Sequence, residues 1–167
     1  MSDCLERIDR FLRRDLGRWT GLDTACTAAD VAQLPFAEGQ GVARLGTSNV
    51  EYLFRVLRHA GLDEGVTFYF DGDALRVIET EYWSLDAVRC GALLKELGEP
   101  SQRVDLQWRD RRIDGAELVF ADRGLAIGVL PETGVIVRVA GFAPCPLETY
   151  RDRYYHAALA REFRSRG

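Results

Sequence analysis

The sequence predicts an α+β protein. We expect two similar halves, each a helix with a four-stranded antiparallel meander, that form a mainly antiparallel sheet with helices on one face and a C-terminal helix. Three observations lead to this prediction. Short β-branched or aromatic runs bounded by Gly, Asp or Pro indicate strands. Longer segments with apolar residues three and four positions apart indicate helices. The chain has 167 residues, which suits a single domain.

Four segments have helical spacing and recognisable ends. They are Ser2–Gly17, Thr27–Leu34, Ser84–Leu97 and Leu147–Arg166. The third is the clearest, because Ser84 can cap its start while Gly98 and Pro100 stop it. Its expected apolar face consists of Leu85, Val88, Ala92, Leu93 and Leu97.

Eight strands are expected between these helices. They are Val42–Leu45, Val50–Leu57, Val66–Phe70, Ala74–Glu81, Arg103–Trp108, Ala116–Ala121, Leu125–Leu130 and Val135–Phe142. Corresponding strands recur about 60 residues apart, which indicates an internal repeat. The sequence therefore predicts one domain, 1–167, with halves at approximately 19–83 and 84–143 and a C-terminal helix at 147–166. The alternative is a coincidence between two unrelated meanders.

Composition excludes several classes of protein. The chain has 22 Lys and Arg against 26 Asp and Glu, a net charge of −4, whereas a nucleic-acid binder needs a basic excess. No apolar run approaches the ~20 residues of a membrane helix. Met1–Gly17 is charged throughout and does not resemble a secretory signal. We therefore expect no nucleic acid, no membrane and a cytoplasmic location.

The basic residues are almost all arginine, and Lys95 is the only lysine. This preference for arginine is typical of a GC-rich bacterial genome.

The chain has two histidines and four widely spaced cysteines, at positions 4, 26, 90 and 145. No pair has the spacing of a zinc or redox motif, so no metal and no cofactor are expected. Reduced thiols are the expectation for a cytosolic protein, although an even number of cysteines leaves a disulfide open.

One segment of the second half resembles a known family. Leu97-Gly98-Glu99-Pro100, followed by the strands up to Phe142, is similar to the tandem-repeat module of β-lactamase-inhibitor-protein-like domains. In the first half, Leu34-Pro35 occupies the matching place. The resemblance implies an eight-stranded sheet with helices on one face. It also implies a partner bound through the open face, with no chemistry of its own. Small bacterial immunity proteins look alike at this level.

Alternation along the strands assigns side chains to the open face. The expected partner-binding residues are Leu53, Tyr69, Asp105, Arg109, Glu117 and Ile136. An aromatic and aliphatic centre with a charged rim is typical of binding surfaces. Alternatively, the C-terminal helix covers this face and makes it a second core. Gly61–Trp83 holds six acidic residues and one basic residue, Arg76, a charge that can steer a basic partner such as a toxin or an enzyme.

The sequence therefore favours a non-catalytic immunity or inhibitor protein that covers a partner protein's functional surface; a homodimer through the open face also fits. The alternative is a small-molecule-binding domain or small enzyme, with an acid/base pocket between the sheet and the C-terminal helix. Its candidate residues are His59, Glu79, Glu81, Tyr82 and Trp83.

Overall fold

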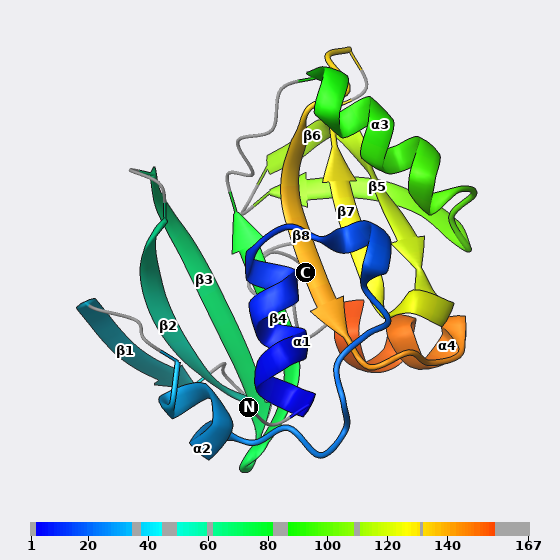
Figure 1. Ribbon diagram of the computed structural model, residues 1–167. Coiled ribbons are helices and arrows are strands. Elements are labelled where there is room, and N and C mark those ends of the chain that lie inside the picture. The colour runs from blue at the N-terminus through cyan, green and yellow to red at the C-terminus, as the bar shows by residue number, and fades with distance from the viewer. Residues whose placement is uncertain are drawn as a thin grey trace.

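The computed structural model describes residues 3–34, 38–44, 50–59, 62–81, 87–108, 111–130 and 132–155. It confirms the α+β class, with helices packed on an antiparallel sheet (Figure 1). The strands are β1 (Glu38–Arg44), β2 (Val50–His59), β3 (Leu62–Asp71), β4 (Ala74–Glu81), β5 (Gln102–Trp108), β6 (Arg111–Phe120), β7 (Leu125–Val129) and β8 (Ile136–Phe142).

The eight strands form one sheet in the order β1-β2-β3-β4-β8-β7-β6-β5. Strands β1 to β4 lie side by side in chain order, and so do strands β5 to β8. The two sets meet where β4 pairs antiparallel with β8. This arrangement is compatible with two related halves, but the internal repeat itself stays a prediction.

Helices and helical turns lie on both sides of this sheet. They are α1 (Asp3–Leu12), α2 (Ala28–Ala32), α3 (Ala87–Leu97) and α4 (Leu147–Thr149), with 3₁₀ turns η1 (Leu16–Arg18) and η2 (Ala121–Arg123) and a π-helical segment η3 (Tyr150–Tyr155). Helix α1 crosses the middle of the sheet in front of β4 and β8 (Figure 1). Its outer side carries three ion pairs in which an acidic residue precedes an arginine by four positions, the favourable orientation in a helix.

The main core lies between the sheet and α1, η1, α2 and α3. The rings of Phe11 and Trp19 lie 5.2 Å apart and pack against β8 at Gly141, where an added Cβ would come within 2.7 Å of Phe11. A side chain at Gly141 would therefore push the aromatic pair off the sheet. The indole N–H of Trp19 donates to the carbonyl of Gly124 at 3.0 Å, which satisfies its buried polar group.

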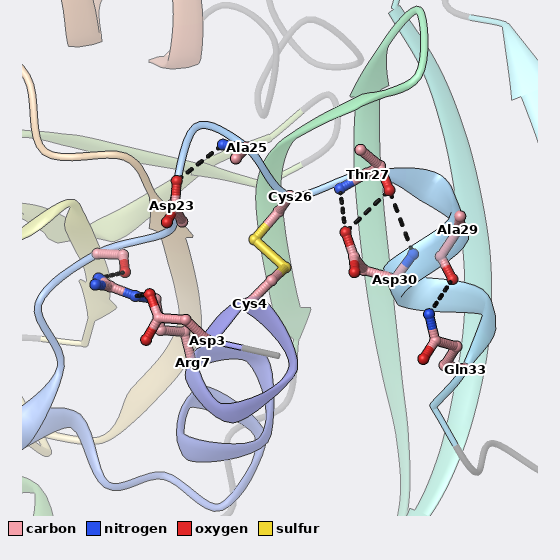
Figure 2. Close-up of a disulfide and its surroundings, with 11 residues drawn as sticks. Asp3, Cys4, Arg7, Asp23, Ala25, Cys26, Thr27, Ala29, Asp30 and Gln33 are labelled. Atoms are coloured by element: carbon pink, nitrogen blue, oxygen red, sulfur yellow. Dashed lines mark hydrogen bonds and ion pairs between the residues drawn. A yellow bond between two sulfur atoms is a disulfide. The ribbon is translucent and has the colours of Figure 1, made fainter. Parts of the chain in front are cut away.

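A disulfide ties α1 to the segment that precedes α2 (Figure 2). Cys4 and Cys26 are both buried, and their Cα atoms lie 5.5 Å apart. This bond corrects the expectation of reduced thiols for these two residues, while Cys90 and Cys145 are free. A spacing of 22 residues carries no sequence signature. The pair meets because the Cys26 carbonyl accepts from the Leu75 N–H at 2.8 Å, which anchors the segment beside β4.

Helix α2 begins at a capping box, close to the sequence-based expectation. The Thr27 hydroxyl accepts a hydrogen bond from the Asp30 N–H, while the Asp30 carboxylate accepts one from the Thr27 N–H (Figure 2). This reciprocal arrangement satisfies two of the N–H groups that a helix start leaves unpaired.

Two helices differ from the prediction. In α3 the buried side consists of Cys90, Leu93 and Leu97, whereas Val88 is 82% exposed. The helix is therefore rotated relative to the expected face, because its apolar positions cover more than one side and the sheet contacts only one. The C-terminal helix begins at Leu147 as predicted, but it continues as a π-helix, and its expected end at Arg166 lies outside the described residues.

Candidate functional site

The middle of the sheet is buried on its second face as well. This face, which we call the second face, lies opposite the main core and is lined by side chains of β3, β4, β6, β7 and β8. Its buried hydrophobic residues are Tyr69, Val77, Val119, Ala121, Ala126, Ala140, Phe142 and Tyr150. The segment 145–154 closes it, with Cys145, Leu147 and Tyr154 partly buried against the cluster.

A charged pair lies inside this apolar layer. Glu117 on β6 and Arg138 on β8 are both buried, and Arg138 Nη2 donates to Glu117 Oε2. The hydroxyl of Tyr150 donates to the other carboxylate oxygen, Oε1. Each oxygen of Glu117 therefore receives a hydrogen bond, which is the condition for keeping a carboxylate out of water. Removal of one partner from a buried pair typically costs about 3–5 kcal/mol.

The backbone register explains how the pair meets. Glu117 is opposite Gly128 on β7, and Gly128 is opposite Arg138 on β8. Neighbouring strands lie about 4.8 Å apart, so the Arg138 side chain spans two strand spacings to reach Glu117. The residue between them has no side chain, and the guanidinium therefore crosses β7 over Gly128. On β4, the neighbour of β8 on its other edge, the residue opposite Arg138 is Glu81.

Glu79 is a further buried carboxylate on the second face. Only 1% of its surface is exposed, and it is opposite Ala140, a member of the second-face cluster. Since residues opposite each other in an antiparallel pair project to the same face, Glu79 lies on the same side of the sheet as Arg138. Among the described side chains, the second face thus holds the carboxylates of Glu79 and Glu117 and the guanidinium of Arg138.

Cys145 is the first residue of the segment 145–154 that covers the second face, and the pKa of its thiol is raised. Burial raises the pKa of the Cys145 thiol, and a hydrogen bond with the backbone of Tyr150 lowers it in part. The thiol form is therefore favoured and the nucleophilic thiolate disfavoured. This makes Cys145 a poor nucleophile.

Three of the six predicted partner-binding residues are buried, which corrects the prediction that they face solvent. Tyr69 and Glu117 do lie on the predicted face, but Tyr150 and Tyr154 close it. This is the alternative in which the C-terminal helix creates a second core. Ile136 belongs to the main core instead. The register of β8 shifts there, since Arg138 is opposite Gly128 and Ile136 is opposite Val129, and the extra residue reverses the alternation.

The remaining predicted positions are only partly described. The backbone places Leu53 in β2 and Asp105 in β5, whereas their side chains and the whole of Arg109 lie outside the described residues. Of the alternative pocket residues, His59 ends β2 and Glu81 ends β4, again without described side chains. Tyr82 and Trp83 lie outside the described residues. Glu79 alone of this set is placed, in the buried layer.

Sequence reasoning missed the partnership of Glu117, Arg138 and Tyr150. Glu117 was expected only as a partner-binding residue of the open face, without Arg138 or Tyr150 as its partners. A usable signal existed, because each residue is the only charged one in its expected strand, Ala116–Ala121 for Glu117 and Val135–Phe142 for Arg138. Such isolated opposite charges on strands of one sheet favour a buried pair.

The described residues contain no group of three or more His, Cys, Asp or Glu able to hold a metal ion. No helix within the described ranges is long and apolar enough to cross a membrane. No protein-family model matches the chain, and neither a curated protein nor a solved structure is significantly similar to it. Fold and site thus define an α+β protein in which the described middle of the sheet is buried on both faces, with a charged pair in one of the two buried layers.

Proposed function

We propose that the chain is a non-catalytic binding protein of the bacterial immunity or inhibitor kind, which covers a functional surface of a partner protein. The observation that carries the proposal is the composition of the second face. Tyr69, Val119 and Phe142 lie on the same face as the Glu117–Arg138 ion pair, and an aromatic and aliphatic centre in which charges are few and paired is typical of partner-binding surfaces. Among the described residues, the segment 145–154 occupies this face.

In this proposal, the partner binds the second face in competition with the segment 147–155.

The burial and full pairing of Glu117 favour a binding role over a catalytic one. Each oxygen of Glu117 accepts a hydrogen bond, from Arg138 or from Tyr150, and the residue is only 1% exposed, so a substrate cannot reach the carboxylate while the segment 145–154 is in place. A folded surface can bind a partner without exchanging protons, whereas an acid/base site needs an accessible group.

The Cys4–Cys26 bond bears on the compartment. The sequence favours the cytoplasm, but disulfides persist mainly in oxidising compartments. The bond is buried, which is typical of a structural disulfide. We therefore place the action of the protein in an oxidising compartment rather than in the cytoplasm, and the partner in the same compartment.

A small-molecule or acid/base role is the second candidate. One observation favours it: Glu79 is buried on the same face as Arg138 and Glu117. Two carboxylates buried on one face can hold a proton or a cationic ligand group. This role also requires the cover to open. Ligand-dependent thermal stabilisation, tested with a panel of amines and sugars, distinguishes it from the protein-binding role.

The test uses the full chain as immobilised bait in extracts of its own cell, including the exported fraction. A recovered partner is then purified and mixed with the chain, and hydrogen–deuterium exchange is measured with and without it. We expect slower exchange in β6–β8 and faster exchange in 147–155. If the method detects micromolar complexes and recovers no protein, the proposed function is wrong. Protection confined to α1 and α3 would refute the proposed site.

A further inference from the structure

We draw no further inference here: the strongest candidate, the outward face of helix α3, where Val88 is 82% exposed and Ala92 is exposed as well, is an apolar surface patch, and nothing in the described part of the structure shows what covers it.

Discussion

Reduction of the Cys4–Cys26 disulfide is the perturbation whose size follows most directly from the structure. The bond closes a loop with a sequence separation of 22 residues. In the chain-entropy description, the entropy that such a crosslink removes from the unfolded state is about 11 cal/mol/K, or about 3 kcal/mol at 25 °C. The native contacts of α1 do not depend on this bond, since Ile8 and Phe11 are buried in the main core.

The free energy of unfolding should therefore fall by about 3 kcal/mol on reduction while the fold is retained. For a chain of this size, the melting temperature should fall by roughly 6–12 °C. Urea unfolding of the same preparation with and without reductant measures the difference, and mass spectrometry after alkylation establishes which thiols are free.

Two variants serve as controls. The double variant Cys4→Ser/Cys26→Ser should not respond to reductant, whereas Cys145→Ser should respond like the wild type, because Cys145 is not in the bond. An unchanged unfolding midpoint in reduced wild type would refute the loop-closure reasoning. Complete unfolding on reduction would show instead that α1 needs the bond to dock.

Four further outcomes are expected. Arg138→Met should lower the free energy of unfolding by about 3–5 kcal/mol, and adding Glu117→Leu should restore most of it; urea titrations of both test whether an unpaired buried charge is the cause. Gly128→Val should cost about 1–3 kcal/mol, because its side chain would stand where the guanidinium crosses β7, and a normal midpoint would disprove the crossing. Thr80→Val should stabilise by about 1 kcal/mol, since the buried Thr80 hydroxyl has no hydrogen-bond partner among the described residues. The Cys145 thiol should react with iodoacetamide more slowly than an unfolded thiol below pH 9, because its folded-state pKa is raised; its contribution to stability is present at neutral pH and lost as the pH rises through that raised value.

The strands could be predicted because their signal is local. Each of the eight appears in the structure within a few residues of its predicted range, since β-branched and aromatic runs between turn residues need no tertiary information. The face assignment also succeeded for Tyr69 and Glu117. It failed at Ile136, because a single extra residue in β8 reverses alternation and leaves no mark in composition.

The candidate site could be predicted only in part, for a different reason. Its residues lie on strands and on a terminal segment whose positions are set by packing, so the Tyr150–Glu117 contact joins groups 33 residues apart. Alternation indicated which side chains share a face, but it could not indicate whether another segment covers that face. The disulfide posed the same problem, because Cys26 is held near α1 by hydrogen bonds to the chain around β4.

The pairing of β4 with β8 has a consequence for biosynthesis. The chain is made from its N-terminus, so β1 to β4 exist well before β8, the last strand to be synthesised. Until β8 arrives, the edge of β4 presents unpaired N–H and C=O groups, the feature by which nascent sheets associate with one another. Ribosome-bound chains that end before Ile136 should therefore be prone to aggregation and should depend on chaperones, and this dependence should end when β8 emerges.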